Sequence, residues 1–297
     1  MKLKNSGLTL VELLTVVGIM ALLVGLLIPA LSTVHRIARE TKQKAHLVAV
    51  ELALTTFKND YGEYPPSDWT PVPMKGDYCG AQKLAEALLG RDLLGFHPRS
   101  NWSATDLTWY PNPTTMDSAL FEANLKQRKE LYLELSNANA FRLGNISLLK
   151  PGLYPDTSPL APDTFVLCDV FGARNVLLTN GKIVKAGAPI LYFKANSSEK
   201  TIQAIYNIND NDAIVALKEQ MDVRGHPFGS GPFYPPYKNR LEFFYGNPDP
   251  ATGIIGYIQN PKVAARPWPY KSDSFILISA GADGIYGTPD DIRNFAD

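Results

Sequence analysis

The feature that most constrains the fold is an apolar stretch from Leu8 to Leu31, which contains one charged residue, Glu12. At about 1.5 Å rise per residue, a helix of this length extends roughly 36 Å. The hydrocarbon core of a bilayer is about 30 Å thick, so this helix is long enough to cross it. The sequence therefore predicts a membrane-spanning helix over 8–31.

Glu12 is the exception within this stretch, because an ionised carboxylate in hydrocarbon costs roughly 2.5 kcal/mol or more and so needs a partner. Three interpretations are open: a cleaved secretory signal, a plain anchor that tolerates one acid, and an assembly helix whose acid another subunit neutralises. A secretory signal has an apolar region of about 7 to 15 residues and then a small-residue cleavage site. The longer stretch here is followed by a charged segment, which argues against such a signal.

The residues around the start of the stretch read G-L-T-L-V-E and follow a short segment with two lysines. This pattern resembles the class III signal of type IV pilins and type II secretion pseudopilins. The resemblance implies that residues 1–7 are a leader, that a prepilin peptidase cuts between Gly7 and Leu8, and that Leu8 becomes N-methylated. It also implies that Glu12 pairs with the Leu8 amine of a neighbouring subunit during assembly.

The helical pattern continues beyond Pro29, because apolar residues recur at three- and four-residue steps as far as Phe57. We expect one helix over 8–61, apolar on all faces in its first half and amphipathic in its second. Pro29 removes one backbone hydrogen bond and is expected to kink or locally unwind this helix, which would make an assembled fibre extensible. Gly62 and the two prolines after it predict the helix end.

Charge and cysteine content bear on nucleic-acid binding, metal binding and disulfide formation. Lys+Arg and Asp+Glu both total 29, so no basic excess favours nucleic acid. The two cysteines, Cys79 and Cys168, lack the C-x-x-C spacing of zinc or redox sites. They form either one disulfide or two separate buried thiols, and the sequence leaves both open.

The orientation of the helix is ambiguous from charge alone. Lys2 and Lys4 precede the apolar stretch, whereas four basic residues follow it within 36–44. Because the more basic flank of a membrane helix usually stays in the cytoplasm, this count would place the rest of the chain after the helix, here called the head, in the cytoplasm. The family resemblance implies the opposite, with the helix in the inner membrane and the head in the periplasm. We adopt that orientation because the leader must face a cytoplasmic peptidase.

The segment 62–162 is expected to be an insertion of helices and loops, larger than compact pseudopilins carry. Two helices are predicted in it, over 81–89 and 116–135. In the longer one we expect Leu120, Phe121, Leu125, Leu131 and Leu135 to face inward.

The segment 163–297 is expected to be β-rich, since short runs of β-branched and aromatic residues alternate with turn residues. The turn signal at 179–181 predicts a hairpin, and a helix over 209–220 is expected to use Asp210 or Asp212 as its N-cap. The expected fold class is therefore α+β, and the resemblance implies a long N-terminal helix packed on a small antiparallel β-sheet head, as in pilins. Strands are predicted within 164–172, 188–195, 201–208 and 274–281.

The loop 280–292 places three aspartates in a glycine-rich turn. Close carboxylates repel one another, and hard oxygen ligands on a flexible backbone are what Ca²⁺ selects. The loop resembles the calcium loop that ends the major pseudopilin of type II secretion systems. The resemblance implies carboxylate ligands from Asp283, Asp290 and Asp291, with backbone carbonyls near Ala280 and Ile285. The alternative is a turn whose aspartates accept its own N–H groups.

Catalysis has no support in the sequence, so the protein is not expected to be an enzyme. Nucleophile elbows, Walker loops and zinc-protease motifs are all absent. The four histidines lie apart, two on the long helix and two in Pro-rich loops, and we expect His35 and His46 to be solvated and His97 and His226 to be surface or packing residues.

The expected function is that of a structural subunit of a type II secretion pseudopilus, of the major G-type. The resemblance implies these partners: further copies of this chain, other pseudopilins, the prepilin peptidase, the inner-membrane platform and the assembly ATPase. Two alternatives remain. One is a type IV pilin for adhesion, motility or DNA uptake, although such pilins more often end in a disulfide-bounded loop; the other is an anchored extracytoplasmic binding protein or enzyme that does not polymerise.

Overall fold

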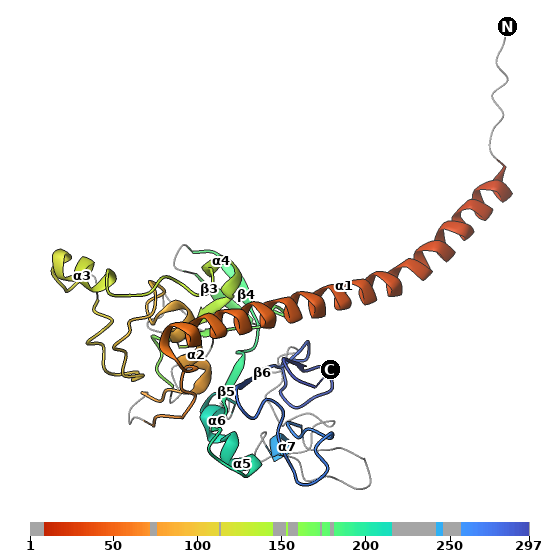
Figure 1. The fold of residues 1–297 in the computed structure, drawn as a ribbon. Helices are drawn as coiled ribbons and strands as arrows, with labels where there is room; N and C mark the ends of the chain where they lie inside the picture. The colour runs from red at the N-terminus through yellow and green to blue at the C-terminus, as the bar shows by residue number, and fades with distance from the viewer. Residues whose placement is uncertain are drawn as a thin grey trace. The chain divides into compact units, whose positions relative to one another are not determined.

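A computed structural model describes residues 9–71, 76–112, 114–144, 153, 160–172, 174–178, 181–215, 242–245 and 257–296 (Figure 1). The chain divides into two compact units, Met1–Lys42 and Gln43–Asp297. A long N-terminal helix and small antiparallel sheets make the fold class α+β, as the sequence predicts.

Helix α1 (Leu10–Tyr61) begins near the predicted position and ends at the predicted one. Gly62 closes it in a left-handed conformation (φ +84°), and the Gly62 N–H donates to the Lys58 carbonyl at 2.7 Å. The helix runs through residue 29 without interruption, so the local unwinding predicted at Pro29 is not observed.

The second half of α1 supplies one wall of the core. Leu47, Val50 and Leu54 are buried at three- and four-residue spacing and pack with leucines of α2 (Gly80–Leu89). Helix α2 occupies the predicted position and ends at Gly90. His46, predicted to be solvated, is only 8% exposed because it lies on this packed face of α1.

The central sheet is buried on both faces. It has the order β5 (Leu191–Lys194), β6 (Phe275–Ser279) and β7 (Ile292–Arg293), with antiparallel pairing throughout. Successive side chains of a strand point to opposite faces. Accordingly, Phe275 and Leu277 of β6 pack against α1 and α2 in a first cluster of buried residues. Ile276 and Ile278 point to the other face of the sheet and belong to a second cluster. This explains why β6 is apolar without alternation.

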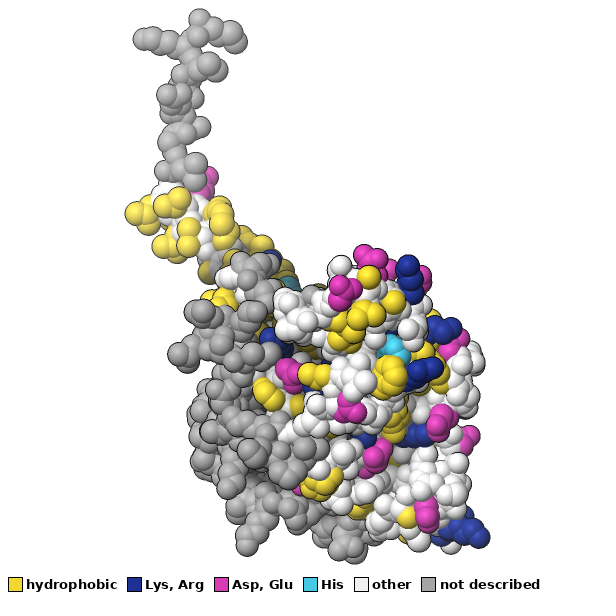
Figure 2. Space-filling model, turned by 90° about the vertical axis from the view of Figure 1, so that its left-hand side faces the viewer, with side chains coloured by type: hydrophobic (Ala, Val, Ile, Leu, Met, Phe, Trp, Pro, Cys, Tyr) yellow, Lys and Arg dark blue, Asp and Glu magenta, His cyan; other side chains and the backbone are white. Residues whose placement is uncertain are grey.

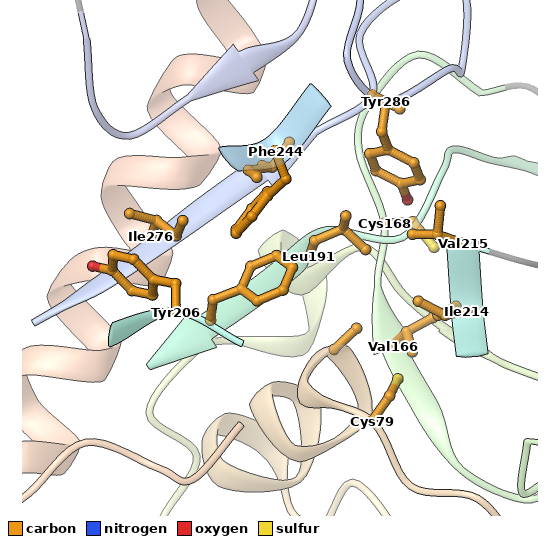
Figure 3. Close-up of a cluster of buried hydrophobic side chains, with 14 of the residues drawn as sticks. Cys79, Val166, Cys168, Leu191, Tyr206, Ile214, Val215, Phe244, Ile276 and Tyr286 are labelled. Atoms are coloured by element: carbon orange, nitrogen blue, oxygen red, sulfur yellow. The ribbon is translucent and has the colours of Figure 1, made fainter. Parts of the chain in front are cut away.

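The second cluster is shown in Figure 3. It joins residues of β5 and β6 to Phe244 of α7 (Glu242–Tyr245) and to Ile214 and Val215 of α6 (Asn209–Val215). Helix α2 contacts β2 (Phe165–Leu167), β5 and α6. The head is therefore organised around β5 and β6, with α1 and α2 on one face.

Two smaller antiparallel pairs complete the described strands. β1 (Ala140–Arg142) pairs with β2 (Phe165–Leu167), and β3 (Arg174–Leu177) pairs with β4 (Ile183–Ala186). The β3–β4 pair confirms the hairpin predicted at 179–181, where the Gly181 N–H donates to the Leu178 carbonyl at 2.9 Å.

The strand predicted over 201–208 is wrong, because the structure has a helical turn there, α5 (Ile202–Ile205). Ile202 and Ile205 are buried, and their spacing of three places them on one face of the helix, while the buried Tyr206 follows directly after it. Helix α6 begins at Asn209, so Asp210 and Asp212 lie inside its first turn rather than at the predicted N-cap.

The helix predicted over 116–135 is also wrong. The structure has two short helices, α3 (Ser118–Leu125) and α4 (Leu135–Ala138). Between them the chain pairs with an earlier segment, since the Lys129 N–H donates to the Phe96 carbonyl and the Tyr132 N–H to the Leu88 carbonyl, both at 3.0 Å. Of the five residues expected to face inward, Leu120, Leu131 and Leu135 are exposed, whereas Phe121 and Leu125 are half-buried.

The cysteines are two buried thiols in the structure rather than a disulfide. Cys79 and Cys168 are separate side chains in the second cluster (Figure 3). Burial raises the pKa of the Cys79 thiol to about 12.

Because only the thiolate is nucleophilic, we expect Cys79 to resist iodoacetamide at pH 8 while the protein is folded and to react once it unfolds. Mass spectrometry of the peptide containing Cys79, after alkylation with and without denaturant, measures this. Equal modification under both conditions would contradict the buried placement.

Candidate functional site: the N-terminal helix and the C-terminal loop

The first half of α1 presents an apolar surface. Its large apolar side chains from Leu10 to Leu31 are between 45% and 77% exposed, and the visible part of this segment is almost entirely apolar in Figure 2. The helix is long and apolar enough to span a membrane, and none of its most apolar window is buried by the rest of the chain. A core helix of a soluble protein would be mostly buried, whereas an anchor or a signal sequence would have this exposure.

Glu12 has hydrogen-bond partners within its own chain. Its Oε2 accepts from the backbone N–H and the hydroxyl of Thr9, both at 2.8 Å, and the Glu12 N–H donates to the Thr9 hydroxyl at 3.3 Å. This reciprocal arrangement is a capping box, which satisfies N–H groups that have no partner at the start of a helix. The Glu12 carboxylate therefore caps its own helix, in addition to any contact that it makes with another subunit.

Of the other residues assigned to processing and assembly, Gly7 and Leu8 lie outside the described residues. Pro29 lies within α1, and only its backbone is described.

The C-terminal loop connects two neighbouring strands, since Ser279 of β6 pairs with Ile292 of β7. Gly281 begins the loop in the left-handed region (φ +68°), and a Cβ there would lie 2.3 Å from the Asp290 carbonyl oxygen. Only glycine fits this position without a shift of the backbone. This close approach of Gly281 to Asp290 brings the two ends of the loop together.

The three aspartates accept hydrogen bonds from their own loop. Asp290 Oδ2 accepts the N–H groups of Ala282 and Asp283 at 2.7 and 3.0 Å. Asp283 Oδ1 accepts from the Ile285 N–H at 2.8 Å. Asp291 Oδ2 accepts from the Gly287 N–H at 2.7 Å and from the hydroxyl of Tyr257. The loop is thus partly neutralised by donors of the protein itself.

Burial and mutual repulsion oppose ionisation of two of these groups. Burial, and then the charge of Asp290, raises the pKa of Asp283 to about 6. The pKa of Asp291 is raised to about 7, mainly by burial and further by its two acidic neighbours. A nearby cation would favour the charged forms of both carboxyl groups.

The loop offers one buried oxygen atom to a cation, but it does not form a complete coordination shell. Asp291 Oδ1 is buried without a hydrogen-bond partner within the described residues. However, the described part of the chain holds no group of three or more His, Cys, Asp or Glu side chains placed to bind one metal ion. Ala280 is fully buried, and the Ile285 carbonyl accepts from the Thr288 hydroxyl at 3.2 Å.

Two contributing residues were missed from the sequence. Thr9 was recognisable, because T-x-x-E at 9–12 is the sequence signature of a capping box. Tyr257 was not, since its contact with Asp291 joins positions far apart in the chain and no local pattern marks it.

Comparison with protein families, curated proteins and solved structures gives no match to this chain. The assignment of function therefore rests on the residues and geometry of the chain itself.

Proposed function

We propose that this protein is a pilin-like subunit that is anchored in the inner membrane by α1 and polymerises into the pseudopilus of a type II secretion system. In this proposal the prepilin peptidase removes residues 1–7 and methylates Leu8. The assembled subunits, in contact with other pseudopilins, the platform protein and the ATPase, drive protein export. The head lies in the periplasm.

The observation that carries the proposal is the two-part character of α1. From Leu10 to Leu31 its apolar side chains are exposed, whereas Leu47, Val50 and Leu54 are buried in the head. A helix that only anchors the head needs no acid within its apolar half, because the acid weakens insertion. The presence of Glu12 at the start of that half favours a role in assembly.

The same helix would suit a type IV pilin. The pseudopilin is favoured because the C-terminal loop contains no cysteine and both cysteines are buried thiols elsewhere. In the proposal, Ca²⁺ binds the loop through Asp283, Asp290 and Asp291. Asp291 Oδ1, which is buried and accepts no hydrogen bond from the described residues, supports this part.

Processing provides the direct test. We expect the mature protein extracted from membranes of cells with an active prepilin peptidase to lack residues 1–7 and to carry one methyl group on Leu8. Intact-mass spectrometry with N-terminal fragmentation measures both changes. The control is Gly7→Val, which should keep the leader because the bulky side chain blocks the cleavage position. A wild-type protein that keeps Met1 in such cells would refute the proposal.

A further inference from the structure

Three side chains that the proposed function does not use meet at one oxygen atom. Oε1 of Glu51, on the second half of α1, accepts from Lys271 Nζ and from Asn294 Nδ2, the latter at 2.7 Å. Lys271 lies shortly before β6, and Asn294 comes directly after β7. One carboxylate oxygen therefore holds an amine and a carboxamide close to each other. We call these three residues the Glu51 triad.

The backbone fixes the positions of the amine-bearing and amide-bearing residues. The Asn294 N–H donates to the Leu277 carbonyl at 3.3 Å. The Lys271 carbonyl accepts from the Ser274 N–H at 3.0 Å and from the hydroxyl of Tyr206. Two donors to one oxygen atom lie at most about 6 Å apart. Bond formation needs an approach to about 3 to 3.5 Å, and rotation of the flexible four-carbon stem of Lys271 provides it.

The carboxamide of Asn294 is held in an orientation that favours attack at its carbonyl carbon. Its Oδ1 accepts from the Leu277 N–H at 2.8 Å. A backbone N–H at this position stabilises the negative charge that develops on the oxygen when a nucleophile adds to the carbon. Its Nδ2 faces Glu51, which is placed to protonate this nitrogen as it leaves. An ordinary ion pair between Lys271 and Glu51 requires neither of these contacts.

We propose that Lys271 and Asn294 form an amide cross-link within the chain, with Glu51 as the proton carrier. Glu51 takes a proton from the Lys271 ammonium, and the lone pair freed on Nζ forms a bond to Asn294 Cγ. The bond from Cγ to Nδ2 then breaks. Glu51 delivers to Nδ2, one after the other, the two protons that Nζ loses. The products are one amide, one ammonium ion and an unchanged Glu51, so the reaction needs no further reactant.

The position of the triad suits this reaction and gives the cross-link a structural consequence. The side chains of Lys271 and Glu51 are 32% and 28% exposed, so the released ammonium ion has a path to solvent. The link closes a covalent ring that contains β6, the C-terminal loop and β7. It would hold the end of β7 to the segment before β6 even when the hydrogen bonds of β7 open. This inference does not depend on the proposed function.

The test is mass spectrometry of the full chain, purified in an uncharged detergent. We expect the intact protein to be lighter than its sequence by one ammonia, after any N-terminal processing is accounted for. Trypsin does not cut after an acylated lysine, so the digest should contain a branched peptide in which the segment 294–297 is attached to Lys271. An intact mass without this loss, together with a linear peptide 294–297, would overturn the proposal.

Three variants assign the roles within the triad. Lys271→Arg keeps the charge and the ion pair, but a guanidinium is not deprotonated in proteins and so is no nucleophile, and this variant should retain the ammonia. Glu51→Gln should leave most of the protein unlinked, because a positioned proton carrier contributes about 100-fold or more to the rate. Lys194→Arg is the matched control at the ion pair with Glu63 (2.7 Å) and should cross-link as the wild type does. A loss of ammonia that persists in Lys271→Arg would indicate cyclisation of Asn294 alone, and either this result or equal cross-linking in Glu51→Gln would refute the proposal.

Discussion

Glu12→Ala is expected to leave the protein in the membrane while fibres no longer assemble efficiently. Removing the carboxylate relieves a cost of roughly 2.5 kcal/mol or more for an acid in hydrocarbon, so insertion should be unchanged or better. The pairing with the Leu8 amine of the next subunit would be lost, and with it the contact that sets the register between helices. The measurement is the ratio of assembled to membrane-bound protein. Assembled protein is the fibre yield in the sheared extracellular or periplasmic fraction, and membrane-bound protein is the amount in the membrane fraction.

The capping box requires two controls, because Glu12 also bonds to Thr9 in its own chain. Glu12→Gln keeps a side chain that can complete the box but removes the charge, whereas Thr9→Val removes the capping hydroxyl and keeps the charge. If the charge drives assembly, Glu12→Gln should fail and Thr9→Val should assemble. Loss of a cap costs only about 0.5 to 2 kcal/mol of helix stability. Normal fibre yield in Glu12→Ala and Glu12→Gln would exclude the pairing role.

The elements predicted correctly from sequence are those whose apolar period is unambiguous. Helix α1 repeats at three- and four-residue steps over many turns, and Gly62 marks its end. Helix α2 is bounded by Gly90 in the same way. The run Phe275–Ser279 is apolar on both faces and too short for an isolated helix, which indicates a buried strand, and it is the centre of the main sheet.

The elements predicted wrongly depend on contacts between distant segments. At 201–208 the β-branched residues suggested a strand, but the helical turn lets Ile202 and Ile205 both fill the core. At 126–134 good helix formers lie in turns and bends instead of a helix, and the backbone there hydrogen-bonds to Leu88 and Phe96. Local propensity is a weak preference, and these long-range bonds override it.

In the candidate sites, too, features within one segment could be predicted from the sequence, whereas contacts between distant segments could not. The three aspartates of the C-terminal loop were visible in the sequence, and the structure places them in one turn. The hydrogen bond from Tyr257 to Asp291 was not visible. It depends on where two separate segments meet, which spacing along one segment cannot specify.

Calcium is expected to raise the melting temperature of the head through the C-terminal loop. Without a cation, Asp283, Asp290 and Asp291 repel one another, and the buried Asp291 Oδ1 has no donor in the part of the chain that the structure describes. A ligand that binds only the folded state at 100 times its dissociation constant adds roughly 2.7 kcal/mol of stability. At about 2 °C or more per kcal/mol, this gives a rise of about 5 °C or more. Thermal unfolding of the full chain in an uncharged detergent, with calcium and with chelator, measures it.

Variants at the loop and away from it separate binding from general effects of charge. Asp283→Ala should abolish most of the rise, because it removes one carboxylate ligand. Asp106→Ala is the matched control, since Asp106 accepts from the Thr108 N–H at 3.0 Å in another exposed turn and should leave the calcium effect intact. Magnesium should give a smaller rise, because it tolerates fewer protein ligands and an irregular loop poorly. Equal melting temperatures in calcium and in chelator for the wild type would mean that the loop is a turn held by its own N–H groups. The choice of a pseudopilin over a type IV pilin would then rest on the cysteines alone.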